Sequence, residues 1–125
     1  MGTNRLARLV AITALCVALA ACGGGGGGSG TTKTAVNGAI TVNAADIHFD
    51  VNTIKASPGP LTVTLHNNGA LDHNFEIDGQ NFELKTSSSK RDATGTVNLQ
   101  AGTYTFKCTV GSHAAQGMKG KIIVG

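Results

Sequence analysis

The chain has 125 residues. Its first thirty differ in composition from the rest, which leaves a folded part of about ninety residues and room for one domain only. Apolar residues make up 41% of the chain, aromatic residues 4%, and there is no Trp, so a core must be built from Val, Ile, Leu and a few Phe side chains. The net charge of +3 includes Arg5 and Arg8; without residues 1–21, eight Lys and Arg oppose seven Asp and Glu. The charge therefore gives nucleic-acid binding no support.

The N-terminus has the three-part layout of a secretory signal. Arg5 and Arg8 precede an apolar stretch, Leu9 to Ala21, that is too short to span a bilayer comfortably. Its end, Leu19-Ala20-Ala21-Cys22, resembles the bacterial lipobox. The resemblance implies cleavage before Cys22, a diacylglyceryl group on its thiol, and attachment of the protein to the cell membrane on the extracytoplasmic side. A buried helix that ends in an incidental Cys is the alternative.

The glycine run that follows can neither bury side chains nor hold fixed dihedral angles, so it is expected to be a flexible tether. The predicted organisation is a signal peptide (1–21), the lipidated Cys22 with its Gly-rich tether (22–34), and one folded domain (35–125). Cys16 would be lost with the signal, which leaves Cys108 as the one thiol of the domain and excludes an intramolecular disulfide. A lone thiol in an oxidising compartment needs to be buried or bound.

Short runs of alternating apolar and polar residues recur through the domain, and none keeps the 3.6-residue period of a helix. The clearest alternation, Leu61 to His66, lies between two strong turn signals, Ser57–Pro60 and Asn67–Gly69. Seven to nine strands of this length favour an all-β Greek-key sandwich or barrel. We expect the polar run Thr86–Asp92 to be a solvated loop, and His48 and His66 to be solvated. The predicted strands are Ile40–Asn43, Ile47–Phe49, Thr53–Ala56, Leu61–Asn67, Asn74–Asp78, Phe82–Leu84, Gly95–Leu99, Thr103–Cys108 and Lys121–Val124.

One group of residues carries the chemistry of a metal site. Cys108, His113 and Met118 have four residues between each neighbouring pair, on a segment that passes through Gly111 and Gly117. A turn this short can direct a thiolate, an imidazole and a thioether to one point. Thiolate and thioether suit Cu(I), imidazole also suits Cu(II), and two His, one Cys and a weak axial Met describe a blue-copper site. The fourth donor has to come from elsewhere, and His73 lies at the edge of a strand after a turn.

The chain resembles the cupredoxins from about Ile40 to its end. The matching pattern is Pro58-Gly59-Pro60-Leu61-Thr62-Val63-Thr64-Leu65, Asn67, Gly69, His73-Asn74-Phe75, Gly102-Thr103-Tyr104-Thr105-Phe106, Cys108, His113 and Met118-Lys119-Gly120. The gap from Cys108 to His113 is similar to that of the auracyanin and rusticyanin branches and longer than in plastocyanins. The interval from His73 to Cys108 is short for those branches, so the resemblance points to the family rather than to a subfamily.

The resemblance implies one copper ion, bound by His73, Cys108 and His113 in a trigonal arrangement with Met118 as axial ligand. It also implies that Asn74 and Thr109 form hydrogen bonds across the site and hold the two ligand segments in register. The histidine of the ligand loop would present a ring edge within an apolar patch. Ala114 and Ala115 would there meet a redox partner.

These features favour a one-electron carrier over an enzyme. The alternative is a cell-surface protein for copper storage or delivery, although such sites usually hold several Met or Cys. Four histidines cannot supply the second copper centre of a multicopper oxidase, and a lone Cys excludes a binuclear site with two bridging thiolates. Zinc would accept two His and one Cys but leaves Met118 unexplained. We expect redox-protein partners, a membrane anchor through Cys22, no nucleic acid, and a monomeric domain.

Overall fold

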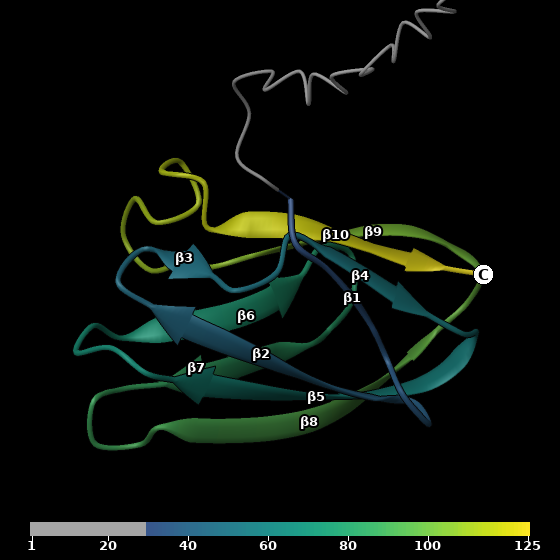
Figure 1. Ribbon diagram of the computed structural model, residues 1–125, viewed down its shortest axis with the longest axis horizontal. Coiled ribbons are helices and arrows are strands. Elements are labelled where there is room, and N and C mark those ends of the chain that lie inside the picture. Colours follow the sequence, from purple (N-terminus) through teal and green to yellow (C-terminus); the bar gives the residue numbers. More distant parts are fainter. Residues whose placement is uncertain (1–29) are drawn as a thin grey trace, which may run out of the picture.

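The computed structural model describes residues 30–125, so the signal peptide, Cys22 and most of the tether lie outside the described residues. Ten β-strands in two sheets make up the regular structure of this part of the chain (Figure 1). No helix in the described part is long and apolar enough to cross a membrane. The prediction of an all-β sandwich is confirmed, with one strand more than the predicted maximum.

The two sheets have six and four strands and pack face to face (Figure 1). The six-stranded sheet has the order β1 (Thr32–Thr34), β4 (Thr53–Ala56), β10 (Lys119–Val124), β9 (Gly102–Lys107), β6 (His73–Ile77), β7 (Glu83–Thr86). The four-stranded sheet has the order β3 (His48–Phe49), β2 (Ala39–Ala45), β5 (Gly59–Asn67), β8 (Asp92–Leu99). Parallel pairing of β4 with β10 and of β2 with β5 joins segments far apart in the sequence.

Side-chain alternation along β5 fixes which face of the four-stranded sheet is buried. Leu61, Val63 and Leu65 are buried, as their spacing predicts, because successive side chains of a strand point to opposite faces. On the outer face, Thr62 and Thr64 form hydroxyl hydrogen bonds with β8 at 2.8 and 3.0 Å. His66 Nδ1 continues this row, 2.5 Å from a carboxylate oxygen of Asp92. His66 is therefore half-buried and paired, whereas His48 is exposed as expected.

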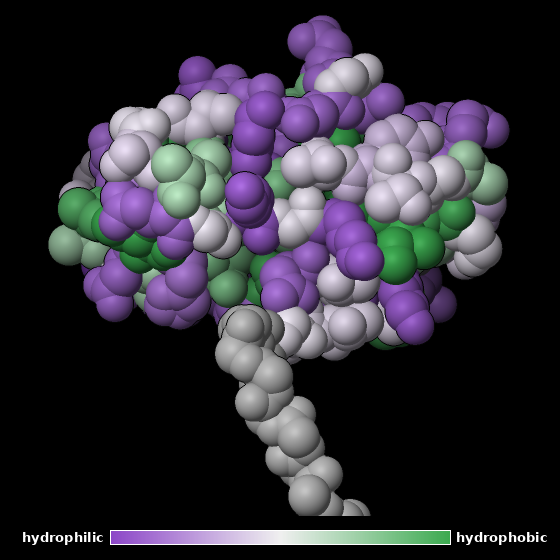
Figure 2. Space-filling model, turned by 90° about the horizontal axis from the view of Figure 1, so that it is seen from above, coloured by the Kyte–Doolittle hydropathy of each residue, from purple (hydrophilic) through white to green (hydrophobic). Residues whose placement is uncertain are grey.

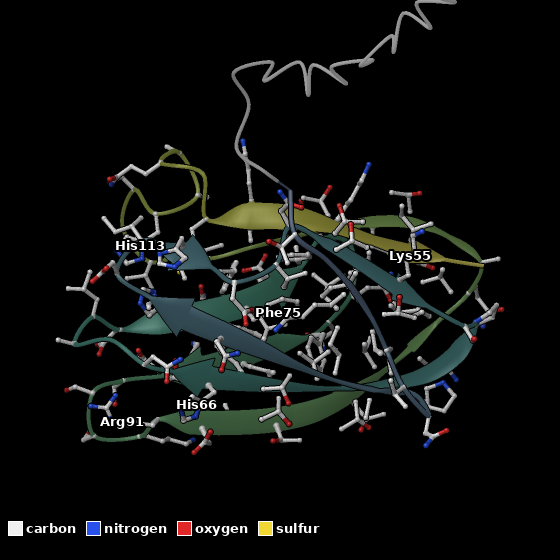
Figure 3. The ribbon with its side chains drawn as sticks, in the orientation of Figure 1. Lys55, His66, Phe75, Arg91 and His113 are labelled. Carbon is white, nitrogen blue, oxygen red and sulfur yellow. The ribbon has the colours of Figure 1, made fainter. Side chains whose placement is uncertain are left out.

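Three Phe side chains fill the core next to one end of the sandwich. The ring centroids of Phe75 and Phe106 are 4.7 Å apart, and Phe49 lies edge-on to both rings at 5.7 and 5.6 Å. Figure 3 places Phe75 between the two layers. Side chains two residues apart along a strand point in the same direction. His73 is two residues before Phe75 and Cys108 is two residues after Phe106, so both side chains point into the same interior as the two rings.

Two sequence predictions need correction. The segment Thr86–Asp92 is not all solvated loop: Thr86 is buried as the last residue of β7, and Asp92 begins β8. The Thr86 side chain points inward, as that of Leu84 does two residues earlier. Its hydroxyl donates a hydrogen bond to the carbonyl of His73 at 3.3 Å. Thr32–Thr34, assigned to the tether, form β1 and pair in parallel with β4. This strand lacks apolar alternation, so the sequence pattern did not reveal it.

Candidate metal centre

The structure brings three of the predicted donors together at one end of the sandwich. His73 begins β6, Cys108 follows the end of β9, and His113 lies in the loop that leads to β10 (Figure 3). Their donor atoms all lie within 4.8 Å of one another. Cys108 Sγ is 4.0 Å from His73 Nδ1 and 3.5 Å from His113 Nδ1, so both imidazoles turn the same ring nitrogen toward the sulfur.

Local hydrogen bonds fold the loop tightly enough to place His113 above Cys108. The loop turns at Gly111 and Gly117, whose φ angles of 50° and 101° lie in the region that favours glycine. The carbonyl of His113 accepts hydrogen bonds from the backbone N–H groups of Gln116, at 3.1 Å, and Met118, at 3.0 Å. The loop conformation therefore depends on its backbone more than on its side chains.

Met118 closes the loop and lies beneath it. Its side chain is fully buried, and its carbonyl accepts a hydrogen bond from the Cys108 N–H at 3.0 Å. The first strand pair after this bond is Lys119 with Lys107, where β10 joins β9. Met118 is thus fixed through its backbone to both Cys108 and His113, and its thioether could serve as a further donor.

The residues fit a single metal ion. Metal–nitrogen and metal–sulfur bonds of about 2.0 to 2.3 Å allow donors of one ion to lie roughly 3.5 to 4 Å apart, which matches the separations between Cys108 Sγ and the two Nδ1 atoms. Burial, and after it the neighbouring His113, lower the pKa of His73, so its imidazole is neutral and free to bind a cation. Cys108 is a buried free thiol. The donor set is that of a mononuclear type 1 copper site.

His73 also has an unusual outer nitrogen. Its Nε2 is buried and, among the described residues, has no hydrogen-bond partner. A buried imidazole normally uses both nitrogens, because an unpaired polar atom costs free energy. With Nε2 unpaired, the ring of His73 is held by packing around it and by whatever binds Nδ1.

Asn74 and Thr109, which follow the first and second donors, meet across the site. The side-chain oxygen of Asn74 accepts a hydrogen bond from the Thr109 N–H at 2.6 Å, and its Nδ2 donates to Thr109 Oγ1 at 2.6 Å. These two bonds tie β6 to the start of the ligand loop, which is the arrangement that the family resemblance implies. Asn74 Nδ2 also donates to Glu83 Oε1 at 2.7 Å, a contact that the sequence analysis did not anticipate.

Glu83 and Thr86 are the residues of the site that sequence reasoning missed. Both lie on β7, whose antiparallel register with β6 places Thr86 opposite His73 and Glu83 opposite Glu76. The turn signal Asp78-Gly79 indicates a hairpin here. A two-residue hairpin turn would fix which residues of the two strands lie opposite each other. The loop from Asp78 to Phe82 is longer than that, so the turn signal alone does not predict this register.

The surface around the ligand loop is partly apolar. Ala115 and Leu71 are exposed, while Ala114 and Val110 are half-buried. Figure 2 shows hydrophobic residues at the left end of the molecule, the end at which Figure 1 places the ligand loop. The predicted lipidation residue, Cys22, lies outside the described part of the chain.

Comparison with known proteins agrees with this geometry. A family model described as "cupredoxin-like domain" matches residues 9–124. The fold is similar to reduced rusticyanin, with a TM-score of 0.60, 26% identity, and coverage of 75% of this chain and 84% of that one. It is also similar to reduced auracyanin from the photosynthetic bacterium Roseiflexus castenholzii, with a TM-score of 0.64, 22% identity, and coverage of 70% and 97%.

A third similar structure is auracyanin A, a "blue" copper protein from the green thermophilic photosynthetic bacterium Chloroflexus aurantiacus. Its TM-score is 0.56 at 20% identity, with coverage of 70% of this chain and 100% of that one. At these identities the two auracyanins establish a shared fold. A search of curated proteins gives no match.

Proposed function

Because the chain belongs to the cupredoxin-like family, we propose that it is a one-electron carrier that holds a single copper ion at His73, Cys108, His113 and Met118. The redox chemistry would come from the bound copper ion, which can exist as Cu(I) or Cu(II). The chain supplies a donor set that suits both oxidation states, with His113 half-buried and the other three donors buried. This role is that of a carrier rather than an enzyme.

One observation carries the proposal: the Nδ1 atoms of His73 and His113 lie 4.0 and 3.5 Å from the Cys108 sulfur, and Met118, bonded to Cys108 through its backbone, is buried. The donors are fixed by elements that have little freedom to move. His73 lies on a paired strand, and the loop between Cys108 and Met118 is closed by a backbone hydrogen bond of 3.0 Å. A site that keeps its geometry favours rapid electron transfer, because little rearrangement accompanies the change of charge.

The test is to add Cu(II) to the purified protein and record its visible spectrum. We expect an intense blue colour from thiolate-to-copper charge transfer, and we expect the variant Cys108→Ser to lose it while the β-sheet circular dichroism is retained. A Cys108→Ser variant that stays blue would end the assignment. A protein that binds Cu(I) tightly but is not oxidised and reduced reversibly would indicate copper storage or delivery instead.

We further propose that the protein works outside the cytoplasm, held to the membrane by a lipid on Cys22. The sequence supports this with a basic start, an apolar stretch and a lipobox-like ending before Cys22. Its partners would then be redox proteins reached at the membrane surface, and the folded domain would act as a monomer. The apolar end around Ala114 and Ala115 is the surface proposed to meet them.

A further inference from the structure

Glu83 lies next to the metal centre but offers it no donor atom. Its side chain, with Asn74, His73 and Thr109, lines one surface hollow beside the site. Asn74 is only 4% exposed, whereas the Glu83 side chain is 36% exposed. Glu83 is therefore a charged group at the edge of a buried hydrogen-bond network.

The Asn74 amide has one orientation that satisfies its neighbours. Its oxygen must face the Thr109 N–H, at 2.6 Å, which leaves its two amide protons for acceptors. Thr109 Oγ1 takes one at 2.6 Å and Glu83 Oε1 takes the other at 2.7 Å. In the flipped amide, the NH2 group would face the Thr109 N–H, and donor would meet donor. Because an ionised carboxylate only accepts hydrogen bonds, Glu83 selects the orientation that binds Thr109.

The bond from Asn74 is the stronger of the two contacts of Glu83. The other contact is an ion pair of 3.1 Å between Glu83 Oε2 and Lys85 Nζ, whose side chain is 73% exposed, and exposed ion pairs contribute little. The hydrogen bond from a buried amide to a carboxylate is charge-assisted and shielded on one side. The pKa of Glu83 is held below its usual range by this bond first and by Lys85 second, so the carboxylate stays ionised at neutral pH.

We propose that Glu83 is a positioning residue for the copper centre: it holds the Asn74 amide that ties the strand of His73 to the residue after Cys108. This inference rests on the copper-binding function proposed above. Two effects follow from the geometry. Loss of the Glu83 bond loosens the link between the two ligand segments. Loss of its negative charge also disfavours Cu(II) relative to Cu(I) and raises the reduction potential.

The first test uses the copper-free full-length protein, so it does not depend on metal binding. We expect Glu83→Ala to speed amide hydrogen exchange at Thr109 by about tenfold or more, because a hydrogen bond to a charged group is lost next to it. Glu83→Gln, whose carbonyl can still accept from Asn74, should give an intermediate rate. The amide of Phe106, deep in the same sheet, serves as the internal control for global unfolding.

Glu76→Gln is the matched control. Glu76 lies directly opposite Glu83 in the strand pair and carries the same charge, but within the described residues its side chain makes no hydrogen bond to Asn74. We expect exchange at Thr109 to be unchanged in this variant. The proposal would be overturned if the Thr109 amide exchanged at the same rate in Glu83→Ala as in the wild type. It would also be overturned if Glu76→Gln accelerated this exchange as much as Glu83→Ala does.

The second test uses the copper-loaded protein. Glu83→Ala should raise the reduction potential more than Glu76→Gln does, and should alter the copper hyperfine coupling in the electron paramagnetic resonance spectrum. If the two variants shifted the reduction potential equally and left the hyperfine coupling unchanged, Glu83 would act through its charge alone. That result would overturn the proposal. Failure of the wild-type protein to bind copper would instead contradict the proposed function, and the exchange result for Thr109 would stand on its own.

Discussion

Two of the proposed donor side chains, those of His73 and Cys108, take their direction from a neighbour in the core. His73 is two residues before the buried Phe75, and Cys108 is two residues after the buried Phe106, so the hydrophobic core that fixes the rings also aims the donors. His113 has no such neighbour and depends on the backbone hydrogen bonds of its loop. The site is thus an extension of the core at two donors and a product of loop geometry at the third.

Met118 allows the axial position to be tested by itself. We expect Met118→Leu to leave copper bound and to raise the reduction potential, because a weak donor that favours Cu(II) is removed. Leu has a similar volume and fills the same fully buried space, so the free energy of unfolding should fall by less than about 1.5 kcal/mol. Voltammetry on the copper-loaded variant gives the potential. Complete loss of copper binding would mean that Met118 is a primary ligand.

Four candidate donors could be predicted from residue type, spacing and the family resemblance, and the structure brings three of them, His73, Cys108 and His113, together. Glu83 could not, because its contact with Asn74 depends on the register between two strands. Residue identity alone leaves that register open, since a carboxylate on a strand is usually solvated.

At the scale of the elements, strands with alternating apolar and polar residues could be predicted from the sequence, whereas strands made of polar residues could not. β5 was predicted nearly to its ends because it alternates strictly between turn signals. β1 has only Thr and Lys side chains, and a contact across the sheets holds it in place. Lys33 of β1 reaches the carbonyl of Thr41 at 3.1 Å and the carboxylate of Asp50 at 2.5 Å. Such a strand is specified by its pairing with β4 and by an ion pair with a distant residue, neither of which the local sequence reveals.

Because Asp50 forms this ion pair, we expect the free energy of unfolding of the sandwich to depend on the ionisation of its carboxyl group, and so on pH. Burial works to raise the pKa of Asp50, but hydrogen bonds from Asn43 and Lys33 outweigh it and keep this pKa below its usual value. A lowered pKa in the folded state means that the stabilisation is fully present above the pKa of an unfolded Asp, about 3.9, and is lost as the pH falls through the lower folded value.

We expect Asp50→Asn to lower the free energy of unfolding by roughly 1 to 2 kcal/mol at pH 7, because one Asn amide proton would face the donors of Lys33 and Asn43. The difference between the variant and the wild type should shrink below about pH 4. Thermal unfolding followed by circular dichroism across this range measures it. Asp78→Asn, which breaks the more exposed pair with Lys107, is the control and should have a smaller effect. A difference that does not depend on pH would contradict this role of Asp50.

At the scale of the whole molecule, the described part of the chain begins beside the start of β10, which directly follows the ligand loop. Gly30 lies in a hollow with Asn52 and the β10 residues Lys119 to Lys121, on the outer side of the six-stranded sheet (Figure 1). The nine residues from Cys22 to Gly30 span at most roughly 30 Å when fully extended. An anchored domain would therefore stay close to the membrane.

Cys22→Ser should release the protein from the membrane fraction and leave the blue spectrum unchanged. The physical reason is that lipid attachment needs the Cys22 thiol, whereas all the proposed copper ligands lie in the described domain. Fractionation followed by a visible spectrum of the soluble fraction checks both parts. Retention in the membrane with an uncleaved N-terminus would indicate an ordinary signal anchor instead of a lipoprotein.

We expect electrons to enter and leave at the end of the molecule that carries the ligand loop. Ala115 is exposed and Ala114 is half-buried beside His113, so the ligand loop presents small uncharged side chains at this end. A partner can approach such a surface without removing water from a charge. We expect Ala114→Lys and Ala115→Asp to keep the spectrum and the reduction potential and to slow electron self-exchange by about tenfold, which corresponds to roughly 1.4 kcal/mol.

The physical reason is that each encounter of two copies would bring like charges together in a desolvated contact. Ala101→Asp is the matched control, because Ala101 is exposed in the turn that precedes β9, at the far end of the strand from Cys108. That variant adds the same charge and should leave the exchange rate nearly unchanged. Line broadening in nuclear magnetic resonance spectra of mixed reduced and oxidised protein measures the rate. Equal rates in the wild type and in both loop variants, with intact spectra, would mean that electrons leave through another face.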